Sequence, residues 1–505
     1  MKNSIVGMGL LLGLVVSGGL ASVACTAPAN TTSDGGTTPP TEDAGTGEDG
    51  GDPSDGGPGA ELPKPVLCPE ANPFSPKNPS SVRIDDVVLK EDQTWTADKV
   101  YLIGDDFKIQ NHKLTVEAGT VICLYQRGKI FVGQGIDPGE IHLNGTKEKP
   151  IVITAPPSSS DPSKPDVFHR GIQFDTFMSS TMSYVNIWYG GPGGGSASPA
   201  FEITNASRGT DPKKPLFVDH LVVGAVQSKG VRIGTDLGVA EGSSIQFTGF
   251  GPRDAGSPAL DAVAEIDIGA SKSVAAAWNM EGATIPDGAK HVNLKNRQTE
   301  GKIQVDTELV DFGLPYVWKN QLIMQVVGAQ NDPVGATLTI KEGVTLKMDG
   351  ALIIGGTSGT AFGNLVIAGT AAKPVTLTST QENPAPGDWE GLYFVSDFYD
   401  TAKTKIEHAQ ILYAGVDPTN GQQINRSVGR CGTAHVGAIM ITASGGTQYD
   451  GPNISNTRIA FSKSDGIVSG ATDSGGFCKT DYAAPGLGIK LENIAGQPLR
   501  NGTCI

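Results

Sequence analysis

An internal duplication constrains this sequence more than any other feature. The segment Leu338–Leu346 matches Leu114–Ile122, with apolar, small and glycine residues at the same positions. The match continues from Gly369–Thr378 to Gly145–Thr154 at the same offset, because 338 − 114 and 369 − 145 both equal 224. Two copies of one structural unit therefore make up most of the chain.

Both copies read as short strands. Apolar runs such as Lys129–Val132, Glu140–Leu143 and Ile151–Ile153 are bounded by Gly, Pro, Asn or Asp, and several alternate with period two. The 68 Gly, the 33 Pro and an aromatic content of 6% agree with many strands joined by turns. Hardly any helical run separates the strands. The pattern therefore favours a solenoid with about three strands per turn over a βαβ sheet.

Three sequence segments of the second copy resemble segments of the right-handed parallel β-helix surface proteins of bacteria. They are Leu338–Leu346, Gly369–Val375 and Pro384–Phe394, the last followed by a strand from Lys405 to Gly415. The first-copy counterpart of the third segment, Asp166–Phe174, lacks its tryptophan. The resemblance implies an all-β fold, a right-handed parallel β-helix built from two tandem homologous units. We place the first unit, with its lead-in segment, at residues 68–298 and the second at 299–505.

Residues 1–24 have the order of a secretory signal. Lys2 precedes the apolar run Ile5–Val16, which is too short to span a bilayer core of about 30 Å. The following Ser22-Val23-Ala24-Cys25 resembles the cleavage box of bacterial lipoproteins, which implies lipidation of Cys25. Cleavage after Ala24 by the ordinary signal peptidase is the alternative. Because Thr26 replaces the Asp that marks inner-membrane retention, we expect the chain to be lipid-anchored at the outer membrane or cell surface.

Residues 25–67 form a linker rich in Gly, Asp, Thr and Pro, which we expect to be disordered. Thr26–Leu67 carries eight acidic residues against Lys64, a net charge of −7 out of −15 for the whole chain. The body is mildly acidic and has no basic stripe. We therefore expect no nucleic-acid partner.

Parallel β-helices include polysaccharide lyases, which gather carboxylates for Ca²⁺ and use a basic residue to abstract a proton. Candidate side chains for such a site are scattered and mostly not repeated between copies: Asp85, Asp86, Asp105, Asp106, His169, Arg170, His220, Glu407 and His408. Period two places Glu407 and His408 on opposite faces of a strand. The seven histidines show no metal-ligand spacing. We therefore assign no catalytic, cofactor-binding or metal-binding residue and expect no cofactor.

Five cysteines remain if Cys25 carries lipid, and they are expected to oxidise after export. The five candidates for disulfides are Cys68, Cys123, Cys431, Cys478 and Cys504. Pairing of Cys68 with Cys123 would hold the lead-in segment to the first copy. Two of the other three would hold the last turns, and spacing does not choose which.

Long connections recur at equivalent positions of the two copies. Pro156–Phe168 and Gly190–Ala200 in the first copy correspond to Ser379–Trp389 and Gly415–Val436 in the second. Loops on one side of a solenoid often form its binding edge. We therefore expect a non-enzymatic surface lipoprotein whose loops serve adhesion or bind a glycan or protein partner. The alternatives are a polysaccharide lyase or related carbohydrate-active enzyme, and a structural component of the envelope.

Overall fold

Most of the body of the chain is described in the computed structural model, and Glu61–Ile505 forms one compact unit. The described residues are 63–72, 76–192, 198–204, 216–228, 230–233, 243–251, 264–267, 278–279, 291–295, 301–304, 306–311, 313–319, 323–328, 334–356, 361–395, 398–415, 428–430, 433–443, 450–471 and 480–501. The predicted signal, the lipidation site and most of the linker lie outside them, as does the boundary between residues 298 and 299.

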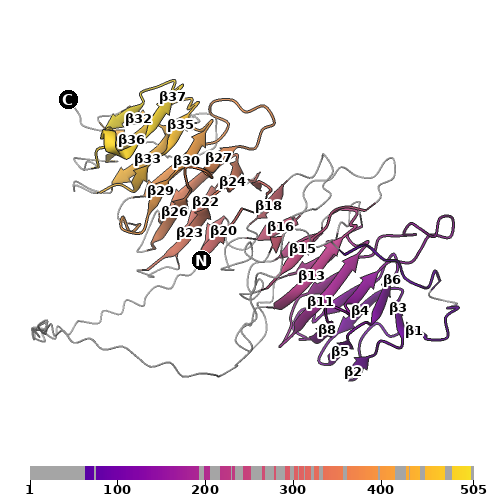
Figure 1. The fold of residues 1–505 in the computed structure, drawn as a ribbon. Coiled ribbons are helices and arrows are strands. Elements are labelled where there is room, and N and C mark those ends of the chain that lie inside the picture. The colour runs from indigo at the N-terminus through magenta and orange to yellow at the C-terminus, as the bar shows by residue number, and fades with distance from the viewer. Residues whose placement is uncertain are drawn as a thin grey trace, which may run out of the picture. The chain divides into compact units, whose positions relative to one another are not determined.

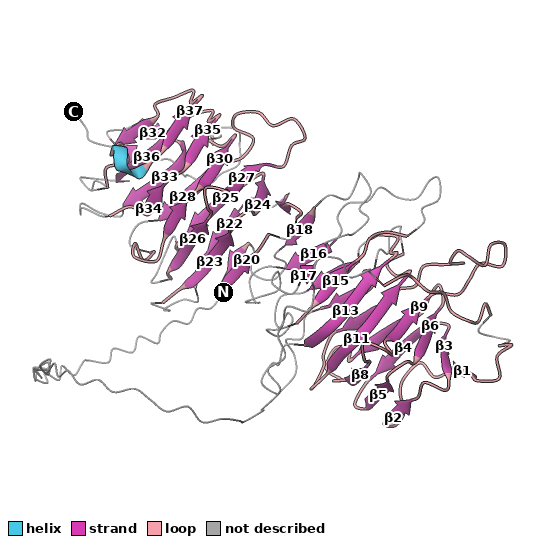
Figure 2. Cartoon of the chain, viewed as in Figure 1, coloured by secondary structure: helices cyan, strands magenta, loops and turns pink. Residues whose placement is uncertain are grey.

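The described body is a parallel β-helix, as the sequence predicts. Its strands lie side by side in successive turns (Figure 1), and loops join them (Figure 2). Every pairing between named strands is parallel, apart from the hairpin of β31 (Val428–Arg430) and β32 (Thr433–His435). The helix of the described residues is a 3-10 turn, η3 (Pro485–Leu487). Each turn of the solenoid crosses three faces, which we number in chain order.

Face 1 opens each turn. In the first copy it contains β2 (Gln93–Trp95), β5 (Lys113–Glu117), β8 (Glu140–Asn144) and the first halves of β11 (Thr181–Trp188) and β13 (Phe217–Gly224). In the second copy it is the sheet of β20 (Thr307–Leu309), β23 (Ala336–Lys341), β26 (Gly363–Ala368), β29 (Lys405–Glu407) and β34 (Asn453–Ser455).

Face 2 follows. In the first copy it contains β1 (Ser81–Ile84), β3 (Val100–Ile103), β6 (Val121–Leu124), β9 (Ile151–Thr154), the second halves of β11 and β13, β15 (Ile245–Phe247) and β17 (Trp278–Asn279). In the second copy it contains β21 (Tyr316–Trp318), β24 (Thr345–Met348), β27 (Val375–Ser379), β30 (Ala409–Leu412), β35 (Arg458–Ala460) and β37 (Lys490–Glu492).

Face 3 completes the turn. In the first copy it contains β4 (Asp106–Ile109), β7 (Lys129–Val132), β10 (Ile172–Phe174), β12 (Phe201–Ile203), β14 (Val231–Ile233), β16 (Ala264–Asp267) and β18 (Val292–Lys295). In the second copy it contains β19 (Lys302–Ile303), β22 (Ile323–Val326), β25 (Ala351–Ile354), β28 (Gly391–Val395), β33 (Gly437–Ala443), β36 (Asp465–Ala471) and β38 (Leu499–Asn501).

The strand ladder continues from one copy into the next. β18 pairs with β16 of the first copy on one side and with β21 of the second copy on the other. Face 3 of the first copy is therefore continued by face 2 of the second copy. The hydrogen-bonded sheet thus passes through the junction, while the equivalent faces of the two copies are displaced by one face around the solenoid.

The duplication is also visible in the backbone, at left-handed residues that are not glycine. Four of them bend the chain before or after face 2 of the first copy, namely Tyr184, Tyr189, His220 and Ala225. Their second-copy counterparts at offsets of 224 or 236 are also left-handed, namely His408, Tyr413, Asn456 and Phe461. A left-handed residue with a side chain costs about 1–2 kcal/mol, so this corner is set by stacking of the turns rather than by local preference.

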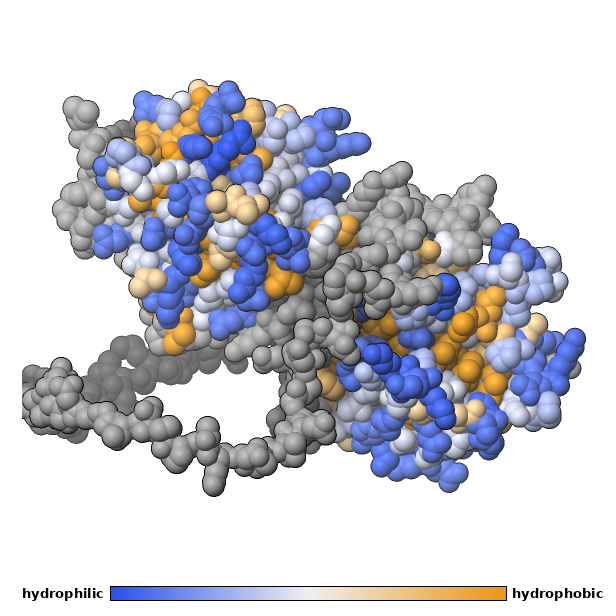
Figure 3. All heavy atoms as spheres, viewed as in Figure 1, coloured by the Kyte–Doolittle hydropathy of each residue, from blue (hydrophilic) through white to orange (hydrophobic). Residues whose placement is uncertain are grey.

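The core consists of inward-facing side chains from the three faces. Along β8, for example, Ile141 and Leu143 are buried while Glu140 and His142 are partly exposed. Each fully buried side chain of this kind contributes about 1.5–3 kcal/mol through removal from water. Among the residues coloured in Figure 3, hydrophilic side chains alternate with hydrophobic patches.

Candidate functional site

A row of charged side chains follows the outer surface of face 3 in the first copy. Parallel pairing places Glu202 of β12 beside Arg232 of β14, and Asp106 of β4 beside Lys129 of β7. These positions alternate with inward-facing apolar residues, so their side chains leave the core on the outside of the sheet. Arg170, just before β10, completes the group. We call these five residues the ion cluster.

The ion cluster is held by three short ion pairs. Lys129 Nζ lies 3.1 Å from Glu202 Oε2, and Arg232 Nη1 donates to Glu202 Oε1 at 2.6 Å. Arg170 Nη1 donates to Asp106 Oδ1 at 2.6 Å. The Lys129 and Glu202 side chains are only 3% and 5% exposed, whereas Arg170 and Arg232 are 32% and 21% exposed. A buried pair is therefore flanked by two guanidinium groups that reach solvent.

The electrostatics of the cluster follow from this burial. Burial lowers the pKa of Lys129, and the neighbouring Glu202 carboxylate opposes that change. The Lys129 ammonium also lies 5.0 Å from the ring centre of Phe131. Among these five residues, three cations stand against two carboxylates. The guanidinium groups of Arg170 and Arg232 reach solvent, and a guanidinium binds an oxyanion through a planar fork of N–H donors.

The second copy provides an internal control for these charges. Its corresponding ladder pairs Met440 with Val468, where the first copy pairs Glu202 with Arg232. Likewise, Ile323 pairs with Ala351 where Asp106 pairs with Lys129. Met440, Val468 and Ala351 belong to a buried apolar cluster, and Ile323 packs against it. The fold is thus built without four of the five charges, and only the Arg170 counterpart, Glu390, is charged.

Two sequence candidates for a lyase site are brought together by the fold, and the others are not. Asp106 and Arg170 form the ion pair described above. The remaining carboxylate pair, Asp85 and Asp86, forms exposed ion pairs with nearby cations of its own segment. The Asp105 side chain accepts a hydrogen bond from the backbone N–H of Asp106.

The histidines among the sequence candidates have local roles. His169 is fully buried and its Nε2 lies 2.8 Å from the Trp188 carbonyl oxygen. His220 bonds to Asp219, and its ring stacks on Tyr184 with centres 4.3 Å apart. His435, which is not one of those candidates, lies in β32, and burial lowers its pKa.

The expectation that Glu407 and His408 alternate within one strand is wrong. β29 ends at Glu407 and β30 begins at Ala409, because His408 adopts a left-handed conformation with φ of 48°. The Lys405–Gly415 segment is therefore two strands on two faces rather than one continuous strand. The alternation rule does not apply across such a corner.

A covalent bond holds the lead-in segment to the first copy. Cys68 is joined by a disulfide to Cys123 of β6. The neighbouring Val66 carbonyl oxygen accepts a hydrogen bond from Thr154 Oγ1 at 2.5 Å, and Cys68 N donates to the Ala155 carbonyl oxygen at 2.9 Å. Residues 63–72, which we call the strap, thus lie across the outside of face 2. Cys25, Cys431, Cys478 and Cys504 lie outside the described residues.

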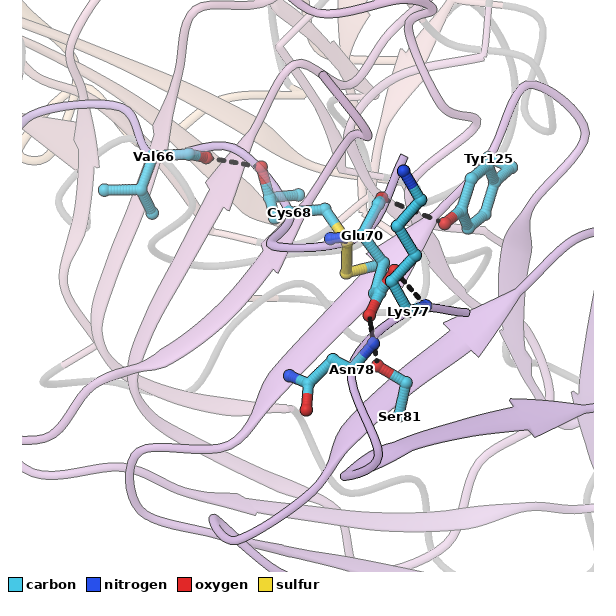
Figure 4. Close-up of a disulfide and its surroundings, with 9 residues drawn as sticks. Val66, Cys68, Glu70, Lys77, Asn78, Ser81 and Tyr125 are labelled. Carbon is cyan, nitrogen blue, oxygen red and sulfur yellow. Dashed lines mark hydrogen bonds between the residues drawn. A yellow bond between two sulfur atoms is a disulfide. The ribbon is translucent and has the colours of Figure 1, made fainter. Parts of the chain in front are cut away.

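The strap is also anchored by a buried carboxylate, as Figure 4 shows. Glu70 accepts hydrogen bonds from the backbone N–H groups of Lys77 (3.0 Å) and Asn78, and from Ser81 Oγ (3.1 Å). Tyr125 Oη donates to the Glu70 carbonyl oxygen at 3.1 Å. Burial alone would raise the pKa of the Glu70 carboxyl, but these donors lower it overall.

The long loops that recur in the two copies differ in their structure and in the sheets they contact. Lys164 N donates to the Asp161 carbonyl oxygen and Ser158 N to that of Lys164, so Pro156–Phe168 contains its own turn. Part of Gly190–Ala200 is outside the described residues. The described part of Gly415–Val436 forms the β31–β32 hairpin, whose first strand packs against β36 and β33 on face 3. That loop therefore covers a sheet of its own copy.

Sequence reasoning missed Lys129, Glu202 and Arg232. Lys129 and Glu202 are 73 residues apart, and Glu202 and Arg232 are 30 apart. Only the strand register brings them together. In the sequence, these three residues are marked only as charged residues next to apolar ones, at the start or in the middle of a predicted strand. Within the described residues, no group of His, Cys, Asp or Glu gathers as a metal site, and no helix has the length and hydrophobicity of a membrane span.

One comparison with known proteins gives a match. Residues 316–422, which lie in the second copy, match the model of a family described as a pectate-lyase-like β-helix domain. Comparison with curated proteins gives no match, and neither does comparison with solved structures. The match agrees with the all-parallel sheets of the described residues and with a parallel β-helix fold.

Proposed function

We propose that the chain is an exported surface lipoprotein that binds an acidic glycan at the ion cluster of its first copy, without cleaving it. The observation that carries the proposal is the contrast between the copies. The second copy fills this ladder with Met440 and Val468, whereas the first copy places Glu202 and Arg232 there. Replacing a buried ion pair by apolar residues is often neutral or stabilising. The charges are therefore better accounted for by a ligand than by folding.

The chemistry of the two guanidinium groups supports a carboxylate-bearing ligand. Arg170 and Arg232 are held by Asp106 and Glu202, so their guanidinium planes are fixed before a ligand arrives. Guanidinium groups bind carboxylates and sulfates in a fork geometry that fixes orientation as well as charge. The similarity of the second copy to a pectate-lyase-like domain supports a carbohydrate as the ligand class.

Binding is tested by calorimetry of the full chain with polygalacturonate and alginate, and with a neutral β-glucan as control. The informative variant carries the residues of the second copy, K129A/E202M/R232V. We expect this variant to keep its melting temperature within a few degrees and to lose acidic-glycan affinity at least tenfold. If the triple variant does not fold, Arg170→Gln replaces it in the same measurement, because this substitution changes only a partly exposed side chain. Unchanged affinity in the folded variants would remove the proposal.

The same samples separate binding from catalysis. Incubation of the acidic glycans with the protein and Ca²⁺, monitored by absorbance of unsaturated products, distinguishes the two. We expect no turnover. Steady product formation that is lost in Arg170→Gln would instead assign a lyase to this cluster.

The surface location is a separate part of the proposal. It rests on the lipoprotein-like box ending at Cys25 and on the acidic linker that follows. Several acyl chains on one cysteine give stable anchoring, whereas one chain is marginal. Metabolic labelling with an alkyne fatty acid should mark the wild-type protein and not Cys25→Ala. Equal labelling of both would exclude the anchor.

A further inference from the structure

A polar groove opens on face 2 of the second copy, away from the ion cluster. Its volume is about 400 Å³, within the usual range of small-molecule sites, and it is open to solvent. Three of its side chains come from one ladder, because Gln410 of β30 pairs with Arg458 of β35, which pairs with Lys490 of β37. His408 and Asn456 line the groove at the corner where the chain enters face 2.

The first copy carries two aromatic rings at the same corner. His408 and Asn456 correspond to Tyr184 and His220, and all four residues are left-handed. The Tyr184 and His220 rings stack with centres 4.3 Å apart and planes within 7°. An aromatic stack therefore stands in the first copy where His408 and Asn456 line the groove in the second. The β-helix is built with either pair at this corner, so His408 and Asn456 are not required by the fold.

The outward-facing side chains of face 2 also differ between the copies, and the second copy carries the cations. In the first copy, the position of Arg458 is occupied by Val222, and that of Lys490 by Gln246. The second copy thus combines a corner without the aromatic stack with two cations that its counterpart lacks. Both differences favour an anionic ligand, and they arise from separate residues.

Arg458 is held in a defined position. Its Nε donates to Glu492 Oε2 at 2.8 Å, and its guanidinium carbon lies 5.7 Å from the ring centre of Phe461. Phe461 in turn stacks on Tyr413 with ring centres 5.0 Å apart. A guanidinium fixed by a carboxylate and an aromatic ring loses little freedom on binding. Lys490 is exposed and provides a second charge one turn away.

We infer that this groove binds a small hydroxylated oxyanion of about one or two sugar rings. Arg458 and Lys490 would take the oxyanion, and the side-chain amides of Gln410 and Asn456 would take hydroxyl groups. Carboxylate and phosphate both fit this chemistry, so the two sources are separate arms of the test. The site is independent of the ion cluster and does not rest on the proposed function.

The test transfers the aromatic pair of the first copy into the second. The variant H408Y/N456H places there the two residues that the first copy carries at left-handed positions. Binding of glucuronate, glucose 6-phosphate and glucose to the full chain is followed by calorimetry or ligand-observed NMR. We expect saturable binding of at least one anion, weaker binding of glucose, and at least a tenfold loss in H408Y/N456H.

Three further variants make the result decisive. R458M/K490M removes the cations without changing the corner, and should lose anion binding even if H408Y/N456H does not fold. Lys405→Met removes an exposed cation of face 1 and should bind as wild type. K129A/E202M/R232V should also bind as wild type, so the two proposals fail independently. No anion binding by the wild type, or undiminished binding by R458M/K490M, would overturn the inference.

Discussion

His169 and Trp389 occupy the same place in the two copies and make the same hydrogen bond. Trp389 Nε1 donates to the Leu412 carbonyl oxygen at 2.7 Å, and His169 Nε2 lies 2.8 Å from the equivalent oxygen of Trp188. Both side chains are fully buried. Gly171 N donates to His169 Nδ1 at 2.9 Å, so Nδ1 is the acceptor and Nε2 carries the proton. The first copy has lost the tryptophan but kept its N–H donor.

This arrangement predicts a pH dependence of stability. Burial lowers the pKa of His169 to about 4 from the ordinary value of 6.5. Above pH 6.5 the ring is neutral in both the folded and the unfolded chain. Between pH 6.5 and 4 the unfolded chain takes up the proton first, so about 3 kcal/mol of unfolding free energy is lost as the pH falls. Denaturant melts at a series of pH values measure this loss.

The control is His169→Phe, which leaves the Trp188 carbonyl and the Gly171 amide without their partner. It should lower the unfolding free energy at pH 7 by about 2–4 kcal/mol, since each orphaned buried group costs about 1–3 kcal/mol. The pH slope between 6.5 and 4 should become shallower than in wild type. An unchanged slope would assign the pH dependence to other groups.

The disulfide predicts how the strap depends on redox conditions. Cys68 and Cys123 are separated by 55 residues, and closing a loop of that length removes about 4 kcal/mol of unfolded-chain entropy. Cys68→Ser should therefore lower the melting temperature. It should also expose the strap to proteolysis before the rest of the body. A reductant should reproduce the release of the strap in wild type and cause no further release in Cys68→Ser.

Glu70 provides the second attachment of the strap. Its carboxylate accepts three hydrogen bonds, and a glutamine amide can present only one oxygen to the same donors. We expect Glu70→Gln to cost about 2 kcal/mol and to release the strap to proteolysis. Glu91→Gln, at an exposed position of the same region, is the matched control and should be neutral. If both variants behave alike, the Glu70 contacts do not anchor the strap.

The repeats predicted the fold because a solenoid stacks one pattern on itself. Leu114–Ile122 and Leu338–Leu346 carry the same alternation, and both place alternate side chains in the core. The corners were less predictable. Left-handed backbone is ordinarily a property of glycine or asparagine, yet Tyr184, His220 and Phe461 adopt it. Their conformation is imposed by the turns above and below, which one segment of sequence does not contain.

The ion cluster was beyond prediction for a related reason. Asp106 and Arg170 were recognisable as charged residues, but nothing in their spacing indicated that they would meet. The outward direction of Lys129 depends on which residues of β7 face the core, and its neighbours depend on the pairing register. Loop lengths between turns vary, so the register of distant strands does not follow from counting residues.

The two copies allow the energetics of the ion cluster to be measured within one chain. Glu202→Gln removes one member and leaves Lys129 buried without its carboxylate, which should cost about 3–5 kcal/mol. The triple variant K129A/E202M/R232V removes both charge signs together and installs the apolar solution of the second copy. It should be close to wild type in unfolding free energy, even though it changes more residues than the single variant.

The reverse substitution, Met440→Glu, places one unpaired carboxylate in the apolar cluster of the second copy and should destabilise as strongly as Glu202→Gln. Denaturant melts of the four proteins check this order. A triple variant less stable than Glu202→Gln would mean that the charges are held for folding, and the case for a ligand at this surface would then rest on the binding data alone.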